Sequence, residues 1–195
     1  MYNSLKMIAV LTITGFLSGG FLTFVYQKTM LEIEMRSLES LRKAIFVVLP
    51  EAVNYKKLRL GEELVYQGID KKGRKVGLAF LAKGSGYQGK IKIMVGVDQD
   101  LNRIQNIQVL ESVETPGLGG KITEEGFQGQ FKGLSIKEGI KLAEEAEKAQ
   151  PSAEAGATIQ AITGATISSK AVVSIINRKI DTIREILQKK NGERL

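Results

Sequence analysis

A charge-free stretch runs from Met7 to Gln27, and it constrains the chain more than any other feature. Its 21 residues would span roughly 30 Å as a helix, about the hydrocarbon thickness of a bilayer. Lys6 and Lys28 bracket it. A cleaved signal peptide is the alternative, but it requires a shorter apolar core and a small-residue cleavage site, and only one alanine precedes residue 44. We therefore expect residues 1–28 to form a retained transmembrane anchor.

The charges that flank this stretch leave its orientation open. Lys6 and the amino terminus precede it, whereas Lys28, Arg36, Arg42 and Lys43 follow it. Counted literally, the positive-inside rule slightly favours a cytoplasmic body. A large folded domain can nevertheless translocate despite such charges, so the charge count does not decide on which side of the membrane the body lies.

Cysteine and histidine are both absent from the chain, and their absence excludes several kinds of site. There can be no disulfide, no iron–sulfur cluster held by thiolates, no Cys/His zinc site and no His-ligated haem. The commonest general base and two usual nucleophile systems are missing as well. We therefore predict no catalytic residue and no metal site, and any redox chemistry has to come from a bound organic cofactor.

Lysine and arginine outnumber aspartate and glutamate by 28 to 21, and much of the surplus lies in the C-terminal segment. The twelve aromatic residues are not interleaved with basic ones, so we expect no nucleic-acid partner. A solvated helix face is the simplest interpretation of the basic segment. Docking of acidic partners or lipid headgroups is the functional alternative.

Hydrophobic periodicity divides the body into helices and strands. Apolar residues at three- and four-residue spacing from Leu31 to Val48 predict an amphipathic helix that stops at Pro50. Residues 62–110 then show the alternation that is typical of strands. The expected strands are 64–69, 75–81, 90–97 and 103–110, and the first two flank a turn at 70–73.

Helical patterns return after the strands. Ser135–Glu138 fits a capping box, which predicts a short helix to about Gln150, followed by a connection at 151–157. From Ser168 an apolar stripe at helical spacing predicts the last helix. This order indicates an α+β fold with a largely antiparallel sheet and flanking helices. We expect an anchor at 1–28, a connecting helix at 29–60 and one domain at 61–195.

Two loops could hold a ligand. Residues 114–120 read E-T-P-G-L-G-G, where the proline fixes one backbone angle and the glycines leave amide donors unobstructed. Such a loop suits a planar or anionic ligand, although a tight turn after a strand explains it equally simply. Residues 163–169 read T-G-A-T-I-S-S just before the last helix. They could cap that helix, or they could bind a phosphate at its N-terminus.

These residues resemble the motifs of the FMN-binding domain family. T-G-A-T at 163–166 is similar to the family's flavinylation motif, and 114–119 is similar to its E-T-P-G-L-G loop. G-Y-Q-G at 86–89, followed by a strand, resembles its G-Y-x-G segment. Two positions depart from the common pattern, with Gln160 where an acidic residue is frequent and Ser112 where histidine is frequent. Motif order and chain length resemble the family of G subunits in Rnf complexes, which are ion-translocating ferredoxin:NAD⁺ oxidoreductases.

The resemblance implies covalent FMN, joined through its phosphate to the hydroxyl of Thr166 by an FMN transferase. It implies further cofactor contacts in both loops. The residues concerned are Thr163, Gly164, Ala165, Ser168, Ser169, Glu114, Thr115, Gly117, Leu118 and Gly119. Ser168 and Ser169 are expected to donate hydrogen bonds to phosphate oxygens, and the helix dipole is expected to add a favourable field.

The resemblance also implies a function. The chain would be an electron-carrying subunit of a membrane-bound oxidoreductase, would turn over no substrate alone, and would assemble with the other membrane subunits. Its domain would lie outside the cytoplasm, where the flavin transferase acts. The alternatives are a flavoprotein like the C subunit of the Na⁺-translocating NADH:quinone oxidoreductase, which is usually longer, or a membrane-anchored binding or assembly subunit without flavin.

Overall fold

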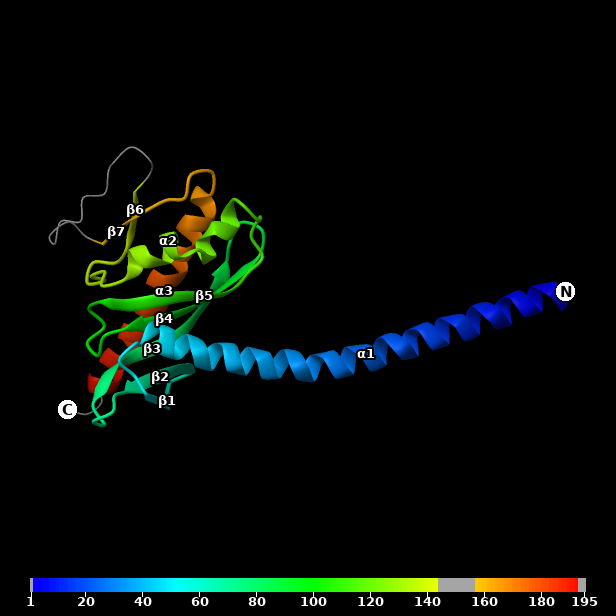
Figure 1. Ribbon diagram of the computed structural model, residues 1–195, viewed down its shortest axis with the longest axis horizontal. Helices are drawn as coiled ribbons and strands as arrows, with labels where there is room; N and C mark the ends of the chain where they lie inside the picture. The colour runs from blue at the N-terminus through cyan, green and yellow to red at the C-terminus, as the bar shows by residue number, and fades with distance from the viewer. Residues whose placement is uncertain (1, 144–156, 193–195) are drawn as a thin grey trace. The chain divides into compact units, whose positions relative to one another are not determined.

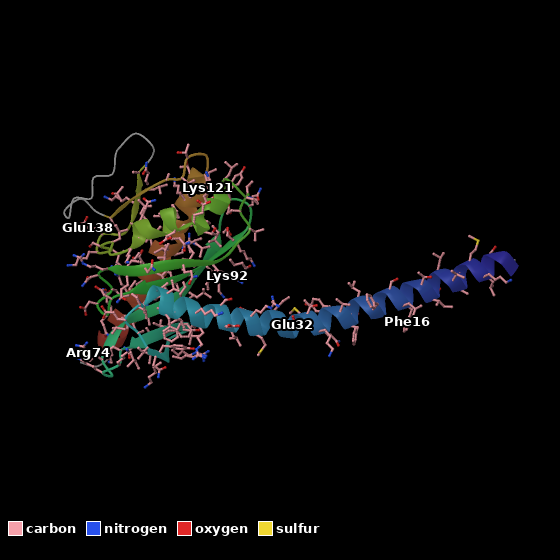
Figure 2. The ribbon with its side chains drawn as sticks, in the orientation of Figure 1. Phe16, Glu32, Arg74, Lys92, Lys121 and Glu138 are labelled. Carbon is pink, nitrogen blue, oxygen red and sulfur yellow. The ribbon has the colours of Figure 1, made fainter. Side chains whose placement is uncertain are left out.

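The computed structural model describes residues 2–143 and 157–192, and the chain divides into two compact units, Met1–Ser40 and Leu41–Leu195. Helix α1, Tyr2–Val48, forms the described part of the first unit, and its residues from Leu41 onwards belong to the second (Figure 1). Its apolar side chains from Leu5 to Tyr26 are exposed, and Phe16, labelled in Figure 2, is 84% exposed. Among the described residues this is the one helix whose length and composition would allow it to cross a membrane.

The second unit is built on a five-stranded antiparallel sheet with strand order β1-β2-β3-β4-β5 (Figure 1). The strands are Asn54–Leu60, Glu63–Ile69, Lys75–Ser85, Lys90–Val97 and Ile104–Ser112. All four strands predicted from the sequence are confirmed, and so is the turn at 70–73. Each strand pairs with the next along the chain, so short turns are enough to connect the whole sheet.

Strand β1 corrects the predicted division of the chain. The predicted division takes all of 29–60 as a connecting helix, although the apolar pattern itself stops at Pro50. In the structure α1 ends at Val48, and residues 54–60 form an edge strand. Leu60 pairs with Glu63 across a two-residue turn in which Gly61 has φ +58°. Only Leu60 of this strand is buried, and three of its seven residues are basic. Its alternation of apolar and polar residues is therefore too weak to predict a strand from the sequence.

The two faces of the sheet bury two separate apolar clusters. On one face, Phe80, Ile93 and Val95 pack with the buried stripe of helix α3, Thr166–Gly192. On the other face, Ala79 and Met94 pack with the end of α1. Successive side chains of a strand point to opposite faces, so β3 and β4 contribute to both clusters. The result is a sheet between two helical layers, the α+β architecture that the sequence predicts.

Glycines let the end of α1 approach the sheet closely. A Cβ atom on Gly96 would overlap the carbonyl of Val48, and one on Gly68 would lie 2.8 Å from Leu49 Cδ1. Asn106 Nδ2 donates to Val47 O at 3.2 Å from strand β5. The last turns of α1, from Leu41 onwards, therefore belong to the folded domain rather than to the anchor.

Short elements connect the sheet to α3. They are η1 (Gly119–Thr123), α2 (Glu125–Gln128), η2 (Gly129–Phe131) and two parallel strands, β6 (Lys141–Ala143) and β7 (Thr158–Gln160). The helix predicted from Ser135 is wrong for residues 135–143. Ser135 bridges to Arg103, and Ile136 N donates to Asn102 O, so tertiary pairing overrides the capping pattern. Its remainder, and most of the connection at 151–157, lie outside the described residues.

Candidate functional site

The E-T-P-G-L-G loop follows strand β5 and forms a tight turn. Leu118 N and Gly120 N both donate to Thr115 O, at 3.2 and 2.9 Å. Gly117, at the third position of the turn, has φ +77°, a conformation that glycine adopts without steric cost. The turn ends directly at η1, so its backbone conformation is fixed from both sides.

The T-G-A-T segment forms a similar turn immediately before α3. Ala165 N donates to Ile162 O at 2.8 Å, and Gly164 has φ +77°. The first intrahelical hydrogen bond runs from Ser169 N to Ala165 O. The N–H groups of Thr166 and the two residues after it therefore have no intrahelical acceptor. They are free donors at the positive end of the helix dipole, an arrangement that suits an anion.

One buried carboxylate connects both turns with the G-Y-Q-G segment. Glu114 is 7% exposed, and its Oε2 accepts the hydroxyl proton of Ser168 at 2.6 Å. Its Oε1 accepts the backbone N–H of Gln88 at 3.1 Å. A Cβ on Gly86 would overlap Oε1, and one on Gly119 would lie 2.8 Å from Oε2, so glycines make room for the carboxylate. Glu114 thus holds three segments that are far apart in the sequence.

A pocket of about 440 Å³ opens where these segments meet. This volume lies within the range of small-molecule and cofactor sites. Tyr87, 65% exposed, and Leu118, 49% exposed, give it apolar surface. Thr166 is half-buried and lines the pocket with its neighbours in α3. The full lining is Tyr87, Glu114, Thr115, Leu118, Gly119, Gly164, Ala165, Thr166, Ile167 and Ser168.

The pocket brings together most of the residues singled out from the sequence. Three of them do not line it, namely Thr163, Gly117 and Ser169. Two lining residues were missed, Tyr87 and Ile167. Tyr87 lies in the G-Y-Q-G segment, so its place in that motif could have identified it from the sequence. For Ile167 the sequence offers only its position in the first turn of the last helix.

The two serines of α3 have internal hydrogen-bond partners in this structure. Ser168 donates its single hydroxyl proton to Glu114, and Ser169 donates its own to Ala165 O at 3.0 Å. Ser169 Oγ also accepts from Ile162 N at 3.1 Å. With both protons engaged, these side chains hold the turn in place, and the free donors at the pocket are the backbone N–H groups. Donation by either serine to a phosphate stays a prediction.

Comparison with protein-family models matches residues 86–181 to the FMN-binding domain. These residues belong to the FMN-binding domain family. The matched range contains all three segments of the pocket, so the site lies within the family's own domain. Strands β1, β2 and β3 all precede the matched range, and they complete the sheet of this FMN-binding domain.

Two relatives match about nine-tenths of the chain. The G subunit of an ion-translocating oxidoreductase complex from Methanosarcina acetivorans is 29% identical, over 91% of this chain and 93% of its own. The G subunit of a proton-translocating ferredoxin:NAD⁺ oxidoreductase complex from Clostridium ljungdahlii is 28% identical, over 89% and 88%. Each match is too long to be confined to the 96 residues that the family model covers.

Two solved structures share the fold. Shewanella oneidensis NqrC is 22% identical with a TM-score of 0.52, covering 67% of this chain and 66% of its own. The C subunit of a Na⁺-translocating NADH-quinone reductase from Parabacteroides distasonis is 23% identical with a TM-score of 0.54, covering 64% and 62%. At these identities the likeness concerns the fold.

Proposed function

We propose that the chain is a membrane-anchored electron-transfer subunit that carries FMN covalently, through its phosphate, on Thr166. The complex would be of the Rnf type, coupling electron transfer between ferredoxin and NAD⁺ to ion translocation. The position of Thr166 carries the proposal. It is half-buried at the pocket, in the first turn of α3 and inside the range matched to the FMN-binding domain.

The residues of the pocket fit FMN at both of its ends. The Oγ atom of Thr166 would lose its proton to a base of the transferase and bond to the FMN phosphorus of a flavin dinucleotide donor, whose P–O bond to the second nucleotide would break and release a nucleoside monophosphate. The free N–H groups of the first turn of α3 would receive phosphate oxygens, with about 0.3–1 kcal/mol from the helix dipole. Tyr87, Leu118 and Ile167 offer apolar surface for the ring. The bound flavin would supply the redox chemistry, and the chain would supply position and electrostatics.

The assignment to an Rnf-type complex rests on the relatives. The two relatives described above are both G subunits of ion-translocating complexes, whereas the NqrC likeness is limited to the fold. Its partners would be the other membrane subunits of the complex and, during maturation, an FMN transferase. Alone it would turn over no substrate. The domain from Leu41 onwards would lie outside the cytoplasm, anchored by the apolar part of α1.

The covalent link is tested by intact-mass measurement of the chain co-expressed with an FMN transferase. We expect one added FMN in the wild type and none in Thr166→Ala. Thr182→Ala is the matched control, because Thr182 lies in the same helix but outside the T-G-A-T motif and does not line the pocket, and its hydroxyl donates to Arg178 O; this variant should keep the full FMN mass. Ala165 precedes Thr166 at the start of α3, so Thr166→Ala removes no helix cap and should change the unfolding free energy by less than about 0.5 kcal/mol.

Two results would contradict the proposal. One is a flavin mass on the peptide of Thr166→Ala that contains the substituted position. The other is an unmodified wild-type chain, which would favour a binding or assembly subunit without flavin.

The orientation is tested separately with reporters fused after Leu195. A reporter that is active only in the cytoplasm should be silent, and one that is active only outside it should be active. The reverse pattern would place the domain in the cytoplasm and would refute maturation by an extracytoplasmic transferase. Fusion of the same reporters before Met1 gives the matched control, because a single span requires the opposite result there.

A further inference from the structure

A second pocket, of about 570 Å³, lies between β6 and α3 and shares no lining residue with the pocket at Thr166. We call it the basic pocket. Its lining is Ile140, Lys141, Leu142, Lys170, Val173, Ser174, Asn177, Arg178 and Asp181. Three cationic side chains thus face one cavity together with a single carboxylate. Neither the sequence motifs nor the proposed flavin site gives these residues a function.

The positive charge of the basic pocket is not neutralised inside the described part of the chain. Other cations of α3 have internal partners: Lys179 forms an ion pair with Glu63, and Arg184 donates to two backbone carbonyls. In contrast, the described residues hold no ion pair of Lys141, Lys170 or Arg178. The one lining carboxylate, Asp181, already lies 3.7 Å from Arg184 Nη1.

The walls of the basic pocket are held in place by a paired contact. Asn177 Nδ2 donates to Ile140 O at 2.8 Å, and Ile140 N donates to Asn177 Oδ1 at 2.9 Å. This double hydrogen bond fixes the start of β6 against α3, so Lys141 stays beside the helix. Lys170, Ser174 and Arg178 follow one another at four-residue spacing and therefore lie along one face of α3.

The lining has the composition of a small-molecule site. Buried Ile140 and Val173 give it an apolar floor, and its volume is typical of pockets that bind organic ligands. Arginine binds phosphate through two parallel N–H groups, and lysine binds it as a point charge. We propose that the basic pocket binds a phosphate-bearing organic anion, with Lys141, Lys170 and Arg178 around the phosphate. A soluble phosphorylated compound and a phospholipid headgroup share this chemistry.

Calorimetric titration of the full-length chain in detergent tests the proposal. The soluble probes are pyrophosphate and AMP, and the headgroup probe is dihexanoyl-phosphatidylglycerol below its critical micelle concentration. Lys170→Gln combined with Arg178→Gln should weaken binding about tenfold or more, since two charge-assisted contacts are lost. Lys57→Gln combined with Arg59→Gln is the matched control: it changes the net charge equally at exposed positions of β1 and should leave the affinity unchanged.

The three probes also separate the two sources. Binding of AMP or pyrophosphate without the lipid indicates a soluble ligand, and the reverse indicates a headgroup; both support the proposal. It is overturned if no probe binds, or if the control pair weakens binding as much as the pocket pair does. It is also overturned if the probes bind only after Glu144, Glu145 and Glu147 are changed to glutamine. In that case these glutamates compete with the probes for the cations of the basic pocket in the natural chain. Thr166→Ala should leave the titration unchanged, so this test is independent of the flavin proposal.

Discussion

At the residue scale, the carboxylate of Glu114 determines how the pocket is assembled. Its two oxygens accept hydrogen bonds from Ser168 and from the backbone of Gln88, and these residues lie 54 and 26 positions away in the sequence. Glycines at 86 and 119 leave the space that the carboxylate fills. The E-T-P-G-L-G loop therefore supplies a side chain to the site as well as an open backbone.

Glu114→Gln should destabilise the domain and weaken the hydrogen bonding of residue 114 to Ser168 in the first turn of α3. The amide has one oxygen, so it can accept from Ser168 or from Gln88 N but leaves the other donor facing an NH₂ group. A buried donor that loses its acceptor costs about 1–3 kcal/mol of unfolding free energy, measurable by urea denaturation. Glu111→Gln is the control, because Glu111 is exposed and its surface pair with Lys92 is worth at most about 1 kcal/mol. Equal losses in the two variants would refute the role given to Glu114.

At the element scale, sequence periodicity predicts what depends on local patterning. The predicted bounds of strand β4 match the structure at both ends, and the predicted stripe of α3 from Val172 to Ile183 is buried. The pattern fails to predict the secondary structure where tertiary contacts determine it. Ser135 has the sequence of a helix cap but pairs with Arg103, and β1 is a strand because β2 provides an edge, although its own residues are mostly polar or charged.

The turn between β2 and β3 predicts a dependence of stability on pH. Backbone N–H of Arg74 donates to Asp70 Oδ1 at 2.8 Å, and so does that of Lys72, while Arg74 Nε donates to Oδ2 (Arg74 is labelled in Figure 2). These contacts, the first of them above all, hold the pKa of Asp70 below its ordinary value. A depressed pKa adds stability above the unfolded-state pKa of about 4, and this stability is lost as the pH falls through the folded-state value.

Asp70→Asn should therefore lower the midpoint of urea unfolding at pH 7, and the difference from the wild type should shrink as the pH falls below about 4. Asp100→Asn is the control, because Asp100 is exposed in another turn and has no resolved hydrogen bond of this kind among the described residues. A difference between Asp70→Asn and the wild type that stays constant from pH 7 to pH 3 would show that the ionised carboxylate is not what stabilises the turn.

At the scale of the whole molecule, the motifs could be recognised in the sequence, but the contacts that bring them together in the fold could not be predicted from it. The residues alone indicated two candidate loops, at 114–120 and 163–169, and the resemblance added the G-Y-Q-G segment and implied that the two loops share a ligand. That Glu114 joins them and that Tyr87 lines the same pocket follow from the fold, in which β3 packs against α3 and Glu114, two residues after the end of β5, accepts a hydrogen bond from Ser168 of α3. The basic pocket had no motif at all, since its residues come from a three-residue strand and a helix face.

The boundary between anchor and domain gives the last prediction. The second compact unit begins at Leu41. Ala44, Ile45, Val48 and Leu49 are fully buried in the apolar cluster that also contains Ala79 and Met94 of the sheet. A chain that begins at residue 41 should therefore be soluble without detergent and should unfold cooperatively. A chain that begins at residue 51 keeps every strand but loses these four side chains, each of which contributes about 1.5–3 kcal/mol when large and fully buried. Because a domain of this kind is stable by about 5–15 kcal/mol, the shorter chain should be unfolded or close to it. Thermal unfolding followed by circular dichroism compares the two, and equal melting temperatures would show that the end of α1 is part of the anchor alone.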